Sequence, residues 1–197
     1  MDLKNIPVDY QIIRSIVEPE TKVLDLGCGN GDLMSLLVQE KRVSAQGIEV
    51  DDKAIYECVA KGLSVFHGDI DSGLPEYPDK SFDYVILNQS LQQVKNVDLV
   101  IQEALRVGRK VFVGFPNFAY YKARAMMFFR GKAPITPSLP YHWHDTPNVK
   151  FLSISDFKGY CIEKNIRIDK VFYLGARRQV TVWPNLFALN AIFVLSK

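Results

Sequence analysis

The sequence has few cysteines and no long apolar run. Its three cysteines, at positions 28, 58 and 161, have neither the spacing of a disulfide framework nor that of a metal site. That pattern is typical of a reducing compartment, so we expect a cytoplasmic protein. The chain has no apolar stretch of about 18 residues, and residues 1–10 lack the features of an export signal. The sequence therefore predicts neither a membrane span nor secretion.

The sequence also lacks an excess of charge of one sign. It has 24 basic and 22 acidic residues among 197, for a formal net charge of +2. Because no strong positive field attracts nucleic acid, we expect no nucleic acid partner. A hydrophobic content of 48% is enough for one sizeable core, while the length is short for two. We therefore expect a single domain over residues 1–197.

The most informative segment that is present is a glycine-rich turn. Residues 23–31 read V-L-D-L-G-C-G-N-G, an apolar strand that leads into a turn and then a helical pattern. Glycines let a ligand approach the backbone closely, and the following helix offers N–H groups at its start. A plain strand-to-helix connection is the alternative. A nicotinamide-dependent dehydrogenase fits poorly, because Asp32 stands where the dinucleotide fingerprint has its third glycine.

Carboxylates around this turn indicate which cofactor it binds. Asp25 and Asp32 flank the turn, where they would repel a pyrophosphate and suit an ammonium and a sulfonium. S-adenosylmethionine carries both cations. Glu49 ends the next apolar run, where a carboxylate can bind ribose hydroxyls, and Asp69 follows a third run, where it can meet the adenine amino group. We expect S-adenosylmethionine or S-adenosylhomocysteine to be bound by Asp25, Gly27, Cys28, Gly29, Asn30, Gly31, Glu49, Val50, Asp69, Ile70, Asn88 and Leu91.

Apolar runs of strand length alternate with helical patterns along the chain. The expected strands are residues 22–26, 45–50, 63–67, 84–88 and 110–115, with a C-terminal hairpin of 167–174 and 189–196. The expected helices are residues 33–40, 53–61 and 97–107, and no helical pattern lies between the last two strands. This alternation predicts an α/β fold: a doubly wound, mostly parallel, seven-stranded Rossmann-like sheet with a C-terminal antiparallel hairpin.

Residues 116–150 are expected to form an inserted aromatic lid. Residues 118–130 are aromatic, Met-rich and basic, which favours a core-facing or lid helix and leaves contact with a membrane or a partner as alternatives. Residues 133–148 contain four prolines and are expected to be a loop. Its histidines lack metal-site spacing, so we predict no metal and an aromatic wall over the cofactor's methyl group. The expected acceptor-binding residues are Gln89, Tyr120, Tyr121, Tyr141, His142 and His144.

The pair Pro116-Asn117 has a superficial likeness to the N/D-P-P-Y motif of amino-group DNA methyltransferases. Phe115 occupies the first position of that motif, however, and Asn117 and Phe118 the last two. The expected role of Asn117 is a turn in which its side chain bonds the nearby backbone.

Several further motifs occur together with the glycine turn of residues 23–31. They are N-Q-S-L-Q at 88–92, G-F-P-N-F at 114–118, L-P-Y at 139–141 with D-T-P-N at 145–148, and W-P-N-L at 183–186. In combination they resemble the MetW family of methionine biosynthesis over nearly the whole chain. The resemblance implies a bacterial class I S-adenosylmethionine-dependent methyltransferase fold that is linked to the homoserine O-acyltransferase step. It implies no methyl acceptor, and His144 stands where we would expect another aromatic residue such as tyrosine.

Two functions follow as hypotheses. The chain is either a methyltransferase that acts on a small acceptor, or a non-catalytic subunit that senses S-adenosylmethionine and activates homoserine O-acyltransferase. No general base can be assigned from the sequence, since His142, His144 and Tyr141 fit equally well as lid aromatics. The sequence therefore leaves the catalytic residues unassigned.

Overall fold

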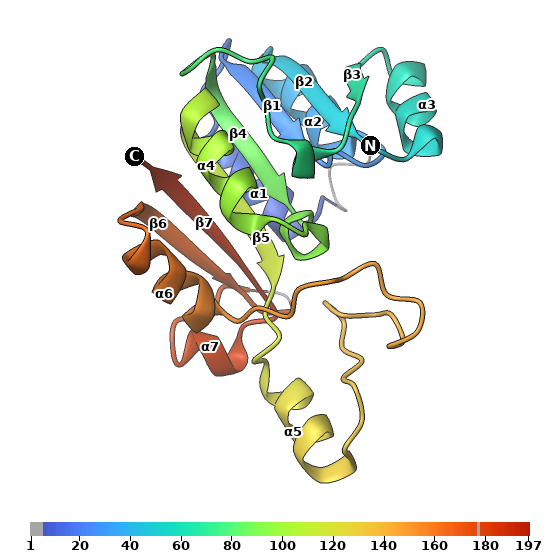
Figure 1. Ribbon diagram of the computed structural model, residues 1–197, viewed down its shortest axis with the longest axis vertical. Helices are drawn as coiled ribbons and strands as arrows, with labels where there is room; N and C mark the ends of the chain where they lie inside the picture. The colour runs from blue at the N-terminus through green and yellow to red at the C-terminus, as the bar shows by residue number, and fades with distance from the viewer. Residues whose placement is uncertain (1–5, 177) are drawn as a thin grey trace.

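The structure, a computed structural model, describes residues 6–176 and 178–197. Its centre is a seven-stranded sheet with the order β3-β2-β1-β4-β5-β7-β6 (Figure 1). Strands β1 to β5 run parallel, and β7 runs antiparallel to both of its neighbours. The strands are β1 Lys22–Leu26, β2 Ser44–Glu49, β3 Ser64–His67, β4 Phe82–Asn88, β5 Gly108–Pro116, β6 Arg167–Leu174 and β7 Asn190–Ser196.

The predicted sheet is confirmed, including its antiparallel pair at the C-terminal end. The expected strands at 22–26 and 167–174 coincide with β1 and β6, and the others differ by one or two residues at one or both ends. The last strand in sequence, β7, lies inside the sheet, and β6 forms the edge. This arrangement follows from composition, because five consecutive residues of β7 are buried whereas β6 mixes charged and apolar residues.

Seven α-helices are described. They are α1 Val8–Ile16, α2 Asp32–Lys41, α3 Asp52–Ala60, α4 Val97–Val107, α5 Tyr121–Arg130, α6 Ile154–Glu163 and α7 Pro184–Phe187, and the short 3-10 helices are η2 Ile70–Ser72 and η3 Leu91–Gln93. The predictions of α2, α3 and α4 are confirmed. Helices α1 and α6 were not predicted, although Ser153 and Asp156 form a capping box that marks the start of α6. The expectation of no helix between β6 and β7 is wrong, because Pro184 starts the single turn of α7.

Helices cover both faces of the sheet and bury its apolar side chains. On one face, α1 and α2 pack Ile13 and Leu37 against Phe112 of β5. On the other face, α4 and α6 contribute Ile101 and Phe157 to the larger cluster. Because both faces are covered there, the central strands β4 and β5 contain long buried apolar runs, which is why the sequence revealed them.

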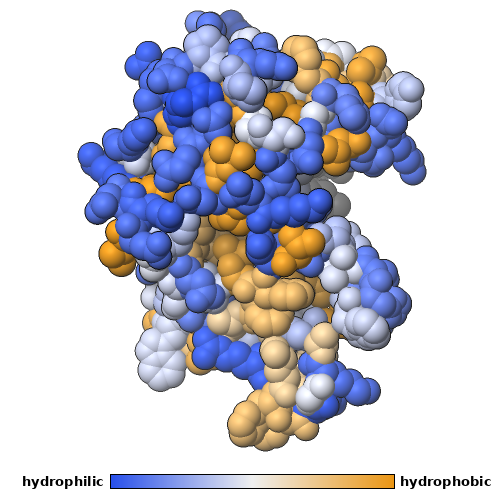
Figure 2. All heavy atoms as spheres, viewed as in Figure 1, coloured by the Kyte–Doolittle hydropathy of each residue, from blue (hydrophilic) through white to orange (hydrophobic). Residues whose placement is uncertain are grey.

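Helix α5 lies away from the sheet (Figure 1). It begins three residues later than the expected helix at 118–130, and its only buried residue is Ala123. Phe128 and Phe129 are 83% and 80% exposed, so a core-facing helix is wrong. Figure 2 shows apolar residues gathered at the lower end of the molecule, where α5 lies. None of the helices in the described ranges has the length and hydropathy that a bilayer crossing requires.

The sheet constrains Gly47 of β2 by close packing. A Cβ at Gly47 would lie 2.5 Å from Cys28 Sγ and 2.9 Å from Met34 Sδ, whereas a Cβ at Gly159 of α6 would meet no atom within 4 Å. We expect Gly47→Ala to lower the free energy of unfolding by about 1–3 kcal/mol through overpacking. Gly159→Ala should raise it by about 0.5–1 kcal/mol, because alanine favours the helix. Urea unfolding measures both, and equal effects would contradict this account.

Candidate functional site

A cavity of about 640 Å³ lies at the carboxyl ends of the strands, where the strand order reverses between β1 and β4. This position is a common binding crevice in open α/β sheets. Of the predicted cofactor residues, nine line the cavity: Gly27, Cys28, Gly29, Asn30, Glu49, Val50, Asp69, Ile70 and Asn88. The other three do not line it. Asp25 and Leu91 are buried, and Gly31 is the N-cap residue of α2.

The glycine turn is shaped by a close contact with the end of β4. Gly27 has a φ of +74°, and a Cβ there would lie 2.7 Å from Ser90 Cβ, so only glycine fits. The N–H groups of Gly27 and Cys28 donate to the carbonyl of Ile48 at 2.8 and 3.2 Å. These two hydrogen bonds therefore hold the turn against β2. A ligand can then approach the backbone of the turn closely, because no side chain projects from its glycines.

Glu49, the last residue of β2, is fixed by three backbone donors. The Gly29 N–H donates to Oε2 at 2.8 Å, and the N–H groups of Val50 and Asp51 donate to Oε1 at 2.8 and 3.0 Å. An ionised carboxylate accepts about four hydrogen bonds in all. Glu49 therefore retains capacity to accept a hydroxyl donor from the cavity.

The wall of this cavity is acidic. Glu49, Asp51, Asp69 and Asp71 line it, and among the described lining residues none is Lys, Arg or His. Backbone donors hold these carboxylates as well: the N–H of Asp71 donates to Asp69 Oδ1 at 2.9 Å, and that of Asn96 donates to Asp71 Oδ1 at 2.7 Å. Such a wall attracts a cation and repels phosphate groups.

Asp32 does not belong to this wall. Its carboxylate lies 2.6 Å from Lys61 Nζ and accepts a hydrogen bond from Asn30 Nδ2 at 3.0 Å. The hydrogen bond from Lys61 lowers the pKa of Asp32. The expectation that Asp32 attracts the cations of a cofactor is therefore wrong, because its charge is already paired at the end of α3.

Asp25 and Tyr10 lie next to the acidic wall and are perturbed by it. Asp25 is 3% exposed in β1. Burial, and next the charge of Glu49, raise the pKa of Asp25 to about 7. Tyr10 of α1 lines the cavity, and burial together with the charge of Asp25 raises the pKa of Tyr10 well above its usual range. At neutral pH the cavity is therefore bordered by a neutral phenol and by a carboxyl that is partly protonated.

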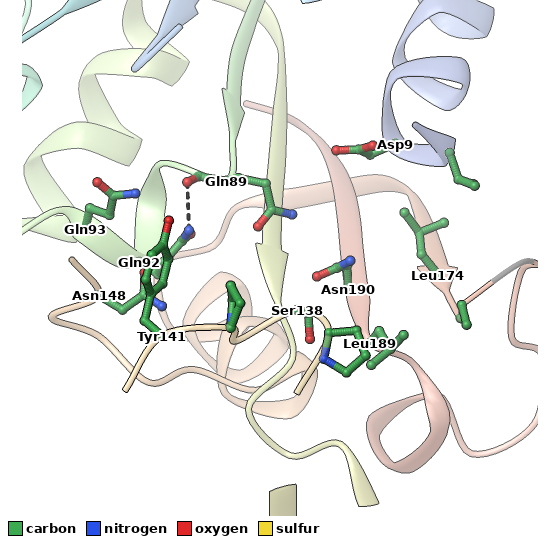
Figure 3. A pocket seen from close by; sticks show the side chains of 15 residues that line it. Asp9, Gln89, Gln92, Gln93, Ser138, Tyr141, Asn148, Leu174, Leu189 and Asn190 are labelled. Carbon is green, nitrogen blue, oxygen red and sulfur yellow. Dashed lines mark hydrogen bonds between the residues drawn. The ribbon is translucent and has the colours of Figure 1, made fainter. Parts of the chain in front are cut away.

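A second cavity of about 590 Å³ adjoins the first. The two cavities share Gln89, Gln93 and Tyr141. Figure 3 shows the side chains of Gln89 and Asn190 in the space between α1 and the loop that carries Tyr141. Of the six predicted acceptor-binding residues, Gln89 and Tyr141 are thus brought to one place.

The other four predicted acceptor-binding residues lie elsewhere. Tyr120 and Tyr121 pack against each other at the start of α5, with ring centroids 4.7 Å apart, and line neither of these cavities. His142 lines a third, apolar cavity of about 450 Å³ together with Met127, and Tyr141 also borders this cavity. His144 stacks on His142 at 5.6 Å between ring centroids. The six residues therefore do not form one wall.

Asn117 follows β5 and is fully buried. The N–H of Ala119 donates to its Oδ1 at 3.2 Å, and its Nδ2 donates to the carbonyl of Ala188 at 2.9 Å. The expected backbone-bonding role of this residue is confirmed.

Sequence reasoning missed several cavity residues, among them Tyr10, Ser90 and Gln93. The signal for Tyr10 was available in the apolar spacing of α1, which buries Ile12 and Ile13. Ser90 precedes and Gln93 ends the three-residue helix η3, which is too short to show a periodicity in the sequence. Only the packing of that segment against the glycine turn places them at the cavity.

The raised pKa of Asp25 predicts a pH-dependent stability. In the unfolded chain this carboxyl titrates near pH 4, so between about pH 4 and 7 folding binds a proton, and stability falls by up to about 1.4 kcal/mol per pH unit. Asp25→Asn should remove that loss. The free energy of unfolding of Asp25→Asn, relative to that of the unmodified chain, should therefore rise from pH 5 to a maximum above pH 7. Urea unfolding across this range measures the effect. Asp145→Asn, on an exposed loop, is the control, and parallel profiles for Asp25→Asn and the unmodified chain would contradict the prediction.

Comparison with known proteins identifies the family of this chain. The family model described as "Methionine biosynthesis protein MetW" matches residues 7–195. The bifunctional methionine biosynthesis protein MetXA/MetW of Rhodopirellula baltica is 36% identical over 203 aligned residues, which cover 96% of this chain and 33% of that protein. The chain thus spans about a third of the length of this relative.

Solved structures share the fold. An S-adenosylmethionine-dependent methyltransferase from Mesorhizobium loti has a TM-score of 0.70 at 18% identity and is matched over 97% of this chain and 98% of its own. A possible histamine N-methyltransferase from Thermotoga maritima has a TM-score of 0.70 at 16% identity, with 96% and 87% covered. At these identities the likeness shows the fold alone, which is that of class I S-adenosylmethionine-dependent methyltransferases. The chain therefore belongs to the MetW family of methionine biosynthesis proteins, as the motifs at 23–31, 88–92 and 183–186 predicted.

Proposed function

We propose that this chain binds S-adenosylmethionine in the acidic cavity and transfers its methyl group to a small acceptor. The observation that carries the proposal is the wall of four carboxylates at the strand-order reversal, without a basic side chain among the described lining residues. A sulfonium and an ammonium suit this wall, and a pyrophosphate does not. The MetW match and the methyltransferase fold support the same assignment.

In this proposal each part of the cavity wall holds one part of the cofactor. Glu49 binds the ribose hydroxyls through the capacity that its three backbone bonds leave. Asp69 accepts from the adenine amino group, with Val50 and Ile70 against the base. The glycine turn admits the amino-acid part, and the buried carboxyl of Asp25, which is partly ionised at neutral pH, lies behind it.

The bound cofactor supplies an activated methyl group, and the chain supplies position. Gln89 and Tyr141 border both cavities and orient the two reactants. The loop that carries Tyr141 and Pro147 limits access of water to the first cavity. This role does not require a general base, so the catalytic residues stay unassigned.

The alternative is a subunit that senses the cofactor and activates homoserine O-acyltransferase. One observation favours it: the Rhodopirellula baltica relative joins MetXA and MetW in one protein. The exposed Phe128 and Phe129 of α5 offer an apolar surface for such a contact. Because the cofactor is made from methionine, such a subunit would report the output of the pathway.

Glu49→Gln tests the cofactor assignment. The amide keeps the size of the side chain but loses the charge and one acceptor oxygen. We expect affinity for S-adenosylmethionine to fall by about 1.5–3 kcal/mol, the range for a hydrogen bond to a charged group. Calorimetric titration measures this, with Glu57→Gln on the exposed side of α3 as a matched control. Unchanged affinity in Glu49→Gln would exclude the ribose role.

Titration with the cognate homoserine O-acyltransferase present separates the two functions. If the chain is an independent enzyme, the partner should leave cofactor affinity unchanged. A change of about fivefold or more in cofactor affinity would favour the sensor function. Linkage then requires the cofactor to change the affinity for the partner by the same factor. In that case Met127→Asp, at a residue that is 48% exposed on α5, should abolish the shift and leave cofactor binding intact. Loss of folding in Met127→Asp would instead show that the residue packs against the body.

A further inference from the structure

Helix α5 and the loop that follows it expose large apolar side chains on one surface. Phe128 and Phe129 pack edge to face at the C-terminal end of α5, with ring centroids 4.9 Å apart. Trp143 of the following loop is 78% exposed. A cluster of this kind in water marks an interaction site. The α5 surface, as we name it, consists of Lys122, Arg124, Met127, Phe128, Phe129, Arg130, Lys132 and Trp143.

The apolar cavity of about 450 Å³ belongs to the same surface. Met127 and Trp143 line it, together with the more deeply placed Leu139 and Phe118. Because Met127 and Trp143 are themselves exposed, the cavity opens beside the rings of α5. The α5 surface therefore has both projecting rings and a hollow, and aromatic and Met side chains of this kind are enriched in protein–protein interfaces.

The charge of the α5 surface has one sign. Lys122, Arg124, Arg130 and Lys132 are exposed, and residues 104–144 contain no Asp or Glu. Within residues 6–176 and 178–197, none of these four cations forms an ion pair. The whole chain has a formal net charge of only +2, so this is a local excess. The four cations are therefore free to pair with carboxylates of another molecule.

Two other occupants suit the α5 surface less well. In a symmetric dimer this surface would face its own copy, and the cations of one copy would repel those of the other. A helix that lies on a bilayer has one apolar face. Residues 126–129 are four consecutive apolar residues, which extend around a full turn of α5 because a helix has about 3.6 residues per turn. A protein with carboxylates around an apolar hollow matches both the charge and the shape.

We propose that the α5 surface docks on homoserine O-acyltransferase, where Phe128 and Phe129 enter an apolar hollow that is bordered by carboxylates. This inference rests on the alternative under the proposed function, and it adds which residues make the contact and what charge the partner presents. The Rhodopirellula baltica relative supports this partner, because a fusion keeps its MetXA and MetW parts at a high effective concentration. No residue of α5 lines the acidic cavity, so the contact leaves that cavity accessible to the cofactor.

The test titrates the full chain with the cognate homoserine O-acyltransferase and measures Kd. We expect Phe128→Ala to weaken the complex at least about tenfold, because buried aromatic anchors dominate such contacts. Tyr56→Ala, at a residue that is 74% exposed on α3, is the matched control and should change Kd less than about twofold. Both residues are exposed, so we expect both variants to fold. Equal effects of the two substitutions, or no complex with the unmodified chain, overturn the inference.

Charge reversal tests the carboxylates of the partner. Arg130→Glu combined with Lys132→Glu should weaken the complex at least about tenfold at low salt, and less as salt screens the interaction. Lys53→Glu combined with Lys170→Glu, at exposed positions of α3 and β6, changes the net charge equally and is the control. If both double variants weaken the complex to the same extent, the net charge and not the α5 surface is responsible, and the inference is wrong.

Two further measurements separate this partner from the other occupants. Binding of the chain to vesicles of phosphatidylglycerol that Phe128→Ala abolishes would assign the surface to a bilayer. A dimer in sedimentation that Phe128→Ala abolishes would assign it to a second copy. Either result overturns the inference. Failure of S-adenosylmethionine to bind would remove the proposed cofactor function alone, because these measurements of Kd need no cofactor.

Discussion

The site depends on one carboxylate that ties two turns together. Glu49 ends β2 and accepts the N–H groups of Gly29, Val50 and Asp51. The first of these donors belongs to the turn after β1, and the other two belong to the turn after β2. Without Glu49, three backbone donors would lose their acceptor, and the partly buried bond that joins Gly29 to the end of β2 would be lost. The residue that faces the cavity is therefore also the residue that builds it.

This arrangement gathers negative charge. Each acidic residue of the first cavity is held in place by backbone N–H groups and not by a basic side chain. The cavity thus keeps a negative potential that salt bridges would cancel. Asp25 is buried behind the cavity, and the charge of Glu49 contributes to its raised pKa. Asp32 differs from these residues because it forms an ion pair with Lys61, so its charge does not add to the negative potential of the cavity.

The sequence was sufficient wherever a residue's role follows from its neighbours along the chain. The strands β1 and β4 were predictable from their apolar runs. The grouping of carboxylates was predictable because parallel strands place their carboxyl ends at one edge of the sheet. The second cavity was not predictable, because Asp9, Gln89, Ser138 and Asn190 meet only through folding. The same limit explains the error at 118–130: its apolar composition suits a core, but the sheet is already covered by α4 and α6.

The second cavity bears on the choice between enzyme and sensor. A protein that only senses its cofactor needs the acidic cavity and a surface that responds to it. It has no use for an adjoining cavity of about 590 Å³ that borders the first at Gln89 and Tyr141. Nor does it need a strained Gln89 at the junction, since strain of this kind persists only where surrounding bonds enforce it. The exposed α5 remains available for a partner in either case, because it lies apart from both cavities. Catalysis and regulation would thus use different parts of the chain, and a contact at α5 does not argue against an acceptor beside Gln89.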